Sequence, residues 1–226
     1  MPTGQFYPIK LISKEVIARD IVELTFEKPA GFMFLAGQFV QFQVPDGKDR
    51  AFRSYSLSSI PTESHLQFCT KILPDGKASQ FFSQLQNGDT AYISNAKGVF
   101  VCKGDSIPQV FIATGTGLAP VMSMVSAQTG ATHPRELLFG VRSEEDMFWT
   151  ERLEKLKASD PNFKYQVTLS KPSEKWAGLT GRVTDHLVID TSAVYYICGS
   201  LPMVKDARTL LVSKGVPVKQ IYFEIF

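Results

Sequence analysis

The chain has 226 residues, with 24 lysines and arginines against 22 aspartates and glutamates, and its formal net charge at pH 7 is +2. This near balance gives no basic stripe of the kind that follows a nucleic-acid backbone, so a nucleic-acid partner is not expected. No segment approaches the roughly 20 apolar residues of a membrane-spanning helix, and the opening MPTGQFYPIK contains no secretory signal. We therefore expect a cytoplasmic protein of one large or two moderate domains.

The first half of the chain has the pattern of short β-strands. Apolar and polar residues alternate at residues 37–44, 52–59 and 65–73, which is typical of strands. GKASQFFSQL, residues 76–85, breaks this pattern, because Phe81, Phe82 and Leu85 recur at helical spacing. We predict that residues 1–103 form an N-terminal antiparallel β-barrel with one short helix.

In the second half, strands alternate with helices. The expected strands lie at residues 109–115, 135–142, 162–170, 193–199 and 219–226, and the expected helices at 118–128, 144–159, 181–188 and 201–215. This alternation predicts βαβ crossovers and a parallel sheet with both faces covered. We predict a Rossmann-like α/β domain at residues 104–226, with the boundary in the segment CKGDSIPQ, where Gly, Asp and Pro cluster.

The three cysteines, Cys69, Cys102 and Cys198, lie far apart in the sequence. Their odd number and wide spacing predict neither a disulfide framework nor a zinc or iron–sulfur site, so we expect no metal site. Any redox chemistry would have to come from a bound organic cofactor.

Two segments of the α/β half are candidates for a nucleotide site, because ligands of such sheets bind beyond the carboxyl ends of the strands. In TGTGLAP, Gly115 and Gly117 allow a phosphate to approach the backbone at the start of a helix. Pro120 replaces the third glycine of the usual GxGxxG pattern, so the loop alone is equally consistent with a tight turn. In CGSLPM, Cys198 ends a strand and Pro202 suits the first turn of a helix, although Cys198 could simply be a small buried residue.

RSYS, within the expected barrel, places polar groups inside a strand. Arg53, Tyr55 and Leu57 would share one face of this strand, and Ser54 and Ser56 the other. An aromatic ring beside a guanidinium suits a planar cofactor that carries a pyrophosphate. Taken alone, the segment is also consistent with an exposed strand.

In order along the chain, RSYS, GKAS, GTGLAP, CGSLPM and FEIF resemble the ferredoxin–NADP reductase superfamily, and the resemblance covers essentially the whole sequence. It implies that the first domain binds FAD and the second binds NADPH or NADH. It also implies that Tyr55 stacks on the flavin, that Arg53 binds its pyrophosphate and that Ser56 donates a hydrogen bond near flavin N5. The further flavin contacts that it implies are Ser54, Cys69, Thr70, Lys71, Gly76, Lys77, Ala78 and Ser79.

For the nucleotide, the resemblance implies that the loop from Thr114 through Gly115 and Thr116 to Gly117 receives the phosphates. The residues implied near the nicotinamide are Cys198, Gly199, Ser200, Pro202 and Met203. Arg142 ends the second expected strand of this domain, and Lys171 follows Ser170 at the end of the third, positions from which a cation can reach a 2′-phosphate. These residues favour NADPH slightly, and NADH stays open.

The segment FEIF resembles the terminal stretch of plant-type members of the superfamily. The resemblance implies that Phe226 covers the flavin and that Glu224 is a polar or proton-relaying group; a disordered end is the alternative for Phe226. The residues expected to act at the reaction centre are therefore Ser56, Cys198, Glu224 and Phe226.

The implied function is transfer of a hydride from NAD(P)H to FAD and of electrons onward to a separate acceptor. Three scattered cysteines cannot hold a plant-type iron–sulfur cluster, so we expect the electron acceptor to be a separate molecule. A ferredoxin is the acceptor we expect most, and an oxygenase component or free flavin are the other candidates. The alternatives are an NAD(P)H:flavin reductase and an electron-transfer subunit without turnover of its own. Six basic residues of the barrel could form an acceptor patch, although a solvated face is the simpler interpretation: Lys10, Lys14, Arg19, Lys48, Arg50 and Lys71.

Overall fold

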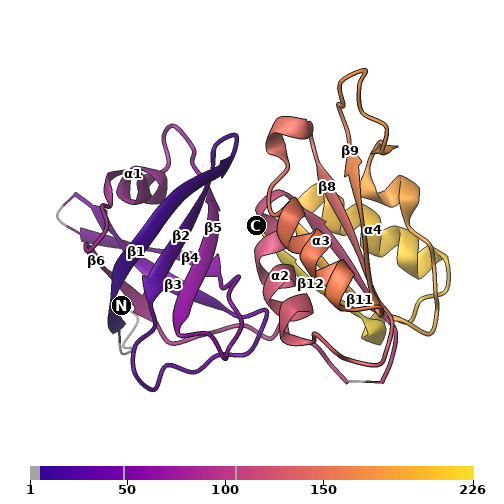
Figure 1. Cartoon of the computed structure of the whole chain (residues 1–226), viewed down its shortest axis with the longest axis horizontal. Helices are drawn as coiled ribbons and strands as arrows, with labels where there is room; N and C mark the ends of the chain where they lie inside the picture. The colour runs from indigo at the N-terminus through magenta and orange to yellow at the C-terminus, as the bar shows by residue number, and fades with distance from the viewer. Residues whose placement is uncertain (1–5, 48, 105) are drawn as a thin grey trace. The chain divides into compact units, whose positions relative to one another are not determined.

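The computed structural model describes residues 6–47, 49–104 and 106–226, and the chain divides into two compact units (Figure 1). The first unit comprises Met1–Val101 with Met122–Ala127, and the second comprises Cys102–Val121 with Gln128–Phe226. In the described part of the chain, no helix is long and apolar enough to cross a membrane.

The first unit is a six-stranded antiparallel sheet in the order β4-β3-β6-β1-β2-β5. Its strands are β1 (Phe6–Ala18), β2 (Ile21–Glu27), β3 (Phe39–Asp46), β4 (Asp49–Ser56), β5 (His65–Lys71) and β6 (Thr90–Ser94). An antiparallel bridge between Leu57 and Phe68 joins the chain just after β4 to β5, so the two ends of the sheet meet. The predicted antiparallel barrel is confirmed.

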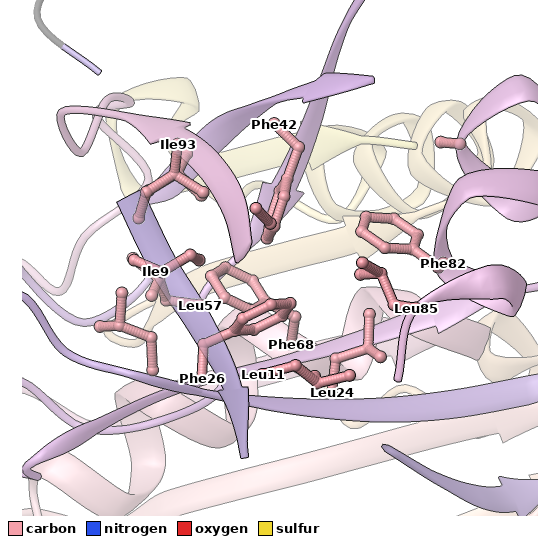
Figure 2. Packing of buried hydrophobic residues seen from close by; sticks show 14 of the residues in the cluster. Ile9, Leu11, Leu24, Phe26, Phe42, Leu57, Phe68, Phe82, Leu85 and Ile93 are labelled. Carbon is pink, nitrogen blue, oxygen red and sulfur yellow. The ribbon is translucent and has the colours of Figure 1, made fainter. Parts of the chain in front are cut away.

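Four phenylalanine rings fill the interior of the barrel (Figure 2). They come from β2, β3, β5 and α1 (Lys77–Gln84), and they are Phe26, Phe42, Phe68 and Phe82. The Phe42 ring lies edge-on to Phe68, with centroids 4.9 Å apart, and to Phe82, at 5.2 Å. Because rings in this arrangement attract each other beyond the effect of burial, they fix α1 against the sheet.

Helix α1 is held at its carboxyl end by a lysine from β1. The Lys14 ammonium donates hydrogen bonds to the carbonyl oxygens of Ser83 at 2.8 Å and Leu85 at 2.6 Å, with Phe82 at 3.3 Å. A cation at this position satisfies carbonyls that have no partner within the helix and favours the negative end of the helix dipole. Lys14 is thus engaged within the barrel, which leaves it out of the suggested basic patch, and Lys48 lies outside the described residues.

The second unit is a parallel six-stranded sheet in the order β10-β9-β8-β7-β11-β12, as predicted for the α/β domain. Its strands are β7 (Gln109–Thr114), β8 (Arg135–Val141), β9 (Phe163–Leu169), β10 (Leu179–Thr180), β11 (Val194–Gly199) and β12 (Ile221–Ile225). Its α-helices are α3 (Thr150–Ser159), α4 (Leu201–Ser213) and the first residues of α2 (Leu118–Ala127), which from Met122 on is counted with the first unit. The fully buried strand β11 lies between β7 and β12, which explains its uninterrupted apolar sequence.

Two expectations for this unit are wrong in detail. The helix expected at residues 144–159 is interrupted: a 3-10 turn at Glu144–Asp146 is closed by a capping box of Ser143 and Asp146, and α3 starts only after Trp149, which has a φ of 57°. The helix expected at residues 181–188 is a 3-10 turn at Val183–His186, and the short strand β10 precedes it.

A buried ion pair connects the amino ends of β8 and β9. The Arg135 guanidinium donates to the Asp160 carboxylate at 2.7 Å and to the Gln128 carbonyl at 2.6 Å, and both charged side chains are almost completely buried. Burial raises the pKa of Asp160, but hydrogen bonds from the Gly130 amide, Arg135 and the Asn162 amide outweigh it and hold the pKa below its ordinary value. The carboxylate therefore stays charged in the folded protein.

We expect Lys14→Met to lower the free energy of unfolding by about 1–3 kcal/mol, because the carbonyls at the end of α1 lose a charged donor. Urea unfolding followed by circular dichroism measures the change. Lys10→Met is the matched control, since Lys10 is an exposed lysine of the same strand. Equal stabilities of the two variants would contradict the role of Lys14.

Asp160→Asn should lower the free energy of unfolding at pH 7 by about 3–5 kcal/mol, because Arg135 is left buried without its counter-charge. The pKa of Asp160 is lower in the folded than in the unfolded chain, where it is near 3.8. Its stabilising contribution is therefore complete above that pH and lost as the pH falls through the folded pKa. Urea unfolding between pH 7 and pH 2 should show the gap between wild type and variant closing below about pH 3.8.

The control for this series is Glu136→Gln, which alters the exposed carboxylate next to Arg135 in β8. We expect it to change stability by less than about 0.5 kcal/mol. If the difference in the free energy of unfolding between wild type and Asp160→Asn stayed constant over the whole pH range, the carboxylate charge would not be the source of the stabilisation.

Candidate cofactor sites

Strand β4 carries the RSYS segment along one end of the barrel sheet, paired with β3. Arg53 and Ser54 are exposed, Tyr55 is half-buried and Ser56 is buried. β4 pairs with β3 in an unbroken register through Arg53 and Ser54, and both of these neighbouring residues are exposed. The Arg53 guanidinium donates to the Phe52 carbonyl at 2.9 Å and otherwise points to solvent, where it can bind an anion.

The Tyr55 ring packs against two phenylalanines of the barrel interior. It lies edge-on to Phe42 of β3, at 5.7 Å and 83°, and to Phe82 of α1, at 5.0 Å and 80°. Burial raises the pKa of the Tyr55 phenol, against smaller opposite effects of a hydrogen bond with Thr70 and of the nearby Arg53 charge. The phenol is therefore protonated at neutral pH, and the ring joins β3, β4 and α1.

Strand β5 supplies the next predicted contacts. Cys69 and Thr70 are buried, whereas Lys71 is exposed. The bridge between Leu57 and Phe68 places this strand beside the end of RSYS.

The GKAS segment forms the start of helix α1. Gly76 precedes the helix, no side chain caps it, and its first turn contains no acidic residue. Ala78 and Ser79 are buried, and the Ser79 hydroxyl accepts a hydrogen bond from the Leu73 amide at 2.9 Å. The first amides of such a helix have no intrahelical partner, so they form an anion site.

Two side-chain details refine this anion site. A Cβ at position 76 would lie 2.7 Å from the Ser79 hydroxyl oxygen, so only glycine leaves that oxygen uncrowded. Lys77 forms an ion pair with Asp46, and its ammonium is therefore already partly neutralised. The backbone amides and Ser79 are better placed than Lys77 to hold a pyrophosphate.

In the second unit, the TGTG loop follows β7. Thr114 ends the strand, and Gly115, Thr116 and Gly117 form a 3-10 turn that leads into α2. Gly115 has a φ of 54° and no atom within 4 Å of its missing Cβ, so the space beside it is open. A Cβ on Gly117 would lie 2.3 Å from the Cys198 carbonyl oxygen, so Gly117 brings this loop against the end of β11.

The end of β11 is packed as closely as the loop beside it. Gly199 has a φ of 151°, and a Cβ there would lie 2.1 Å from the Thr114 hydroxyl oxygen. That oxygen is buried and has no hydrogen-bond partner among the described residues. Cys198 is fully buried, and burial, with a smaller contribution from the Glu224 charge, raises the pKa of its thiol well above its ordinary value. The thiol stays protonated and cannot act as a base or nucleophile near neutral pH.

Helix α4 starts directly after this strand. Ser200 is its N-cap residue, Pro202 lies in the first turn, and both are exposed, whereas Met203 is half-buried. The start of the helix thus adjoins the strand end that carries Gly199, as the sequence predicts for this edge.

Strand β12 brings the predicted FEIF residues to the same edge of the sheet. Glu224 lies opposite Cys198 in the register of β11 and β12. The Phe226 amide donates to the Gly199 carbonyl at 3.1 Å, and the Phe226 ring is 49% exposed. The structure therefore places Cys198, Gly199, Glu224 and Phe226 together.

Exposed cations gather at the carboxyl ends of β8, β9 and β10. The Lys171 amide donates a hydrogen bond to the Arg142 carbonyl at 2.7 Å, and the Ser170 amide donates one to the Val141 carbonyl at 3.1 Å. Arg182 follows β10, which pairs with the end of β9, so a third cation lies at this edge of the sheet. The sequence interpretation missed Arg182 because it assigned GRVTDHLV to a helix.

An acidic residue near these cations is already engaged. The Glu144 carboxylate accepts hydrogen bonds from the Ser173 hydroxyl at 2.6 Å and amide at 3.0 Å. The hydroxyl bond is the largest cause that lowers the pKa of Glu144. Glu144 thus ties the loop after β9 to the turn after β8.

Two dinucleotide-type groups fit these residues. The uncapped start of α1 and the half-buried Tyr55, which contacts the same helix at Phe82, suit a flavin nucleotide. The open space at Gly115 and the buried Thr114 hydroxyl suit a nicotinamide nucleotide.

Comparison with known proteins agrees with this fit. Residues 8–101 match the family model described as the oxidoreductase FAD-binding domain, and residues 111–209 match the oxidoreductase NAD-binding domain. Ferredoxin–NADP reductase B of Sorangium cellulosum is 31% identical, with 96% of each chain covered. The toluate 1,2-dioxygenase electron transfer component of Pseudomonas putida is also 31% identical; the alignment covers 96% of this chain and 65% of that protein.

Solved structures share the fold. A ferredoxin NADP+ reductase from Neisseria gonorrhoeae with bound FAD and NADP superposes with a TM-score of 0.88 at 24% identity, covering 98% of this chain and 99% of that one. An Amycolatopsis cytochrome P450 reductase gives a TM-score of 0.90 at 24% identity, with 99% and 71% covered.

Proposed function

Because the chain belongs to the ferredoxin–NADP reductase family of NAD(P)H-dependent flavoprotein oxidoreductases, we propose that it passes electrons from NAD(P)H through FAD to a separate acceptor. The acceptor that we favour is a ferredoxin. One observation carries the proposal. The Tyr55 ring of RSYS packs edge-on against Phe82 of α1, the helix that begins with GKAS and has no side-chain cap at its start.

On the flavin side, the proposed roles follow from the position of each group. Tyr55 offers a fixed half-buried ring for stacking, and Arg53 offers an exposed guanidinium for the pyrophosphate. The amides at the start of α1, with Ser79, hold the same pyrophosphate. Ser56 is buried at the end of β4 and supplies a hydroxyl donor near the reacting ring. Ser54, Cys69, Lys71, Lys77 and Ala78 complete the proposed contacts.

On the nucleotide side, the TGTG loop binds the phosphates and the end of β11 faces the nicotinamide. The cofactors supply the hydride donor and the hydride acceptor, and the protein supplies their orientation. Cys198 stays a neutral thiol and shapes the site by packing. Glu224 holds a carboxyl beside it, and the exposed Phe226 ring is the proposed cover of the flavin.

We infer a preference for NADPH from the cations after β8, β9 and β10. Arg142, Lys171 and Arg182 are exposed at one edge of the sheet, and arginine and lysine are the side chains that bind a phosphate group. Ser170 adds a hydroxyl at the same edge. Glu144 is hydrogen-bonded to Ser173, and Arg182 lies 3.5 Å from the exposed Asp206 carboxylate, which a bound phosphate would have to displace.

The choice of acceptor rests on the relatives. A ferredoxin–NADP reductase matches over 96% of both chains, whereas this chain spans 65% of the toluate dioxygenase component. A separate ferredoxin is therefore our first candidate, and an NAD(P)H:flavin reductase or an electron-transfer subunit is the alternative.

The proposal includes two further points. The boundary between the FAD-binding domain, residues 1–103, and the NAD(P)-binding domain, residues 104–226, falls between the two segments matched by the family models. The location is the cytoplasm, as the sequence predicts.

Stopped-flow reduction followed by an acceptor panel tests the proposed function. The FAD-loaded chain is mixed with NADPH, and turnover is then measured with a [2Fe–2S] ferredoxin and with free FMN. We expect flavin reduction and faster turnover with ferredoxin. Faster turnover with free FMN would favour the NAD(P)H:flavin reductase. Reduction of the bound flavin without turnover on either acceptor would favour an electron-transfer subunit.

For the nucleotide preference, Arg182→Ala should lower the ratio of kcat/KM for NADPH to that for NADH by about tenfold, because a charged hydrogen bond to the 2′-phosphate is lost. Steady-state kinetics with both nucleotides measure the ratio. Lys164→Ala, which removes an exposed cation from the body of β9, is the matched control. An unchanged ratio in Arg182→Ala would remove this residue from the phosphate site.

A further inference from the structure

We propose that Ser173 and Glu144 are positioning residues for nucleotide selection. Their contact, which we call the clasp, holds the backbone that carries Arg142 and Lys171, two of the cations proposed to bind the 2′-phosphate of NADPH. The inference rests on the proposed function, because it takes these cations as the phosphate site. Neither Ser173 nor Glu144 is assigned a contact with the nucleotide: both act through the chain on either side of them.

The two segments that carry the cations run side by side beyond the ends of their strands. Strands β8 and β9 are neighbours in the parallel sheet (Figure 1), and their register ends at the pair of Val141 and Leu169. Beyond this pair, the Ser170 amide donates to the Val141 carbonyl at 3.1 Å, and the Lys171 amide donates to the Arg142 carbonyl at 2.7 Å. The backbone of Lys171 is therefore held directly beside that of Arg142.

The clasp closes this pairing two residues further along both segments. The Glu144 carboxylate accepts one hydrogen bond from the Ser173 hydroxyl, at 2.6 Å, and another from the Ser173 amide, at 3.0 Å. Hydrogen bonds to an ionised carboxylate are stronger than those between neutral groups. The Ser173 hydroxyl bond also lowers the pKa of Glu144, so the carboxylate is charged and the clasp is closed at neutral pH.

The remaining polar atoms of Ser173 build the turn that follows it. Its carbonyl accepts a hydrogen bond from the Trp176 amide at 3.2 Å, and its hydroxyl oxygen accepts one from the Lys175 amide at 3.3 Å. The Trp176 indole donates in turn to the carbonyl of Leu179 at 2.9 Å, and Leu179 begins β10, which pairs with the end of β9. Ser173 thus joins a loop that is tied back to the sheet to the turn after β8.

This arrangement favours binding of a phosphate by exposed cations. Arg142 and Lys171 have long side chains in solvent, and ordering such side chains opposes binding. A fixed backbone beneath both residues leaves less freedom to be lost when a phosphate binds between them. Because NADH has no 2′-phosphate, the clasp should contribute to the choice between the two nucleotides more than to nucleotide binding in general.

The clasp itself is tested by hydrogen exchange of the Ser173 amide, measured by NMR in the FAD-loaded chain. We expect exchange about fivefold faster in Glu144→Ala than in wild type, because local opening no longer breaks these hydrogen bonds. The Ser192 amide, which donates to the Asp190 carboxylate at 2.8 Å before β11, is the internal control and should exchange at the same rate in both proteins. Equal exchange of Ser173 in both proteins would overturn the proposal.

The role in selection is tested by calorimetric titration of the FAD-loaded chain with adenosine 2′,5′-bisphosphate and with adenosine 5′-monophosphate, which differ only in the 2′-phosphate. We expect wild type to bind the bisphosphate more tightly, and Ser173→Ala to reduce this ratio of affinities about three- to tenfold. Ser173→Thr keeps the hydroxyl and should restore most of the ratio. Ser192→Ala, which removes the matching serine–carboxylate contact before β11, should leave the ratio unchanged.

A double-mutant cycle separates the clasp from a simple effect of charge. In a Glu144→Ala background, Ser173→Ala should add nothing, because the clasp is already open. A higher ratio in Glu144→Ala than in wild type would show that the carboxylate repels the phosphate, and it would overturn the proposal, as would an unchanged ratio in Ser173→Ala. If wild type binds both nucleotides equally, the proposed preference for NADPH fails, and the exchange of Ser173 shows separately whether the clasp forms.

Discussion

The edge-on contact of the Tyr55 ring with Phe42 and Phe82 is the interaction on which the proposed flavin site depends. Phe42 belongs to the barrel core, and Phe82 belongs to the helix whose start forms the anion site. Because the Tyr55 ring contacts both phenylalanines, one apolar cluster positions the proposed stacking ring and the helix whose first amides are proposed to bind phosphate. The polar segments of the proposed flavin site are therefore positioned by the packing beneath them.

In the second unit, the corresponding constraint is close backbone approach. Gly117 allows the TGTG loop to reach the Cys198 carbonyl, and Gly199 allows the end of β11 to lie on Thr114. Any Cβ at either position would collide with its neighbour, so two glycines bring adjacent strand ends together. The phosphate loop and the nicotinamide edge are therefore consequences of one packing arrangement. The buried Cys198 thiol belongs to this packing, and its raised pKa keeps it out of proton transfer.

Much of this organisation could be predicted from sequence, because it is expressed in local periodicity. Period-two alternation identified the barrel, and alternating strands and helices identified the parallel sheet. The features that were missed are a contact between distant residues, a strand too short to show a period, and a local capping box. Lys14 caps a helix about 70 residues further along the chain, and the two-residue strand β10 is too short to show a period. Arg182 was missed for the second reason, and the break before α3 depends on a local capping box with buried aromatic residues behind it.

The most direct test of the central claim is anaerobic spectrophotometric titration of the full chain after incubation with FAD and removal of free flavin. The account predicts one FAD per chain, with visible absorption that is bleached by one equivalent of NADPH. A chain that retains no flavin after reconstitution, or whose bound flavin is reduced by neither NADPH nor NADH, would contradict it.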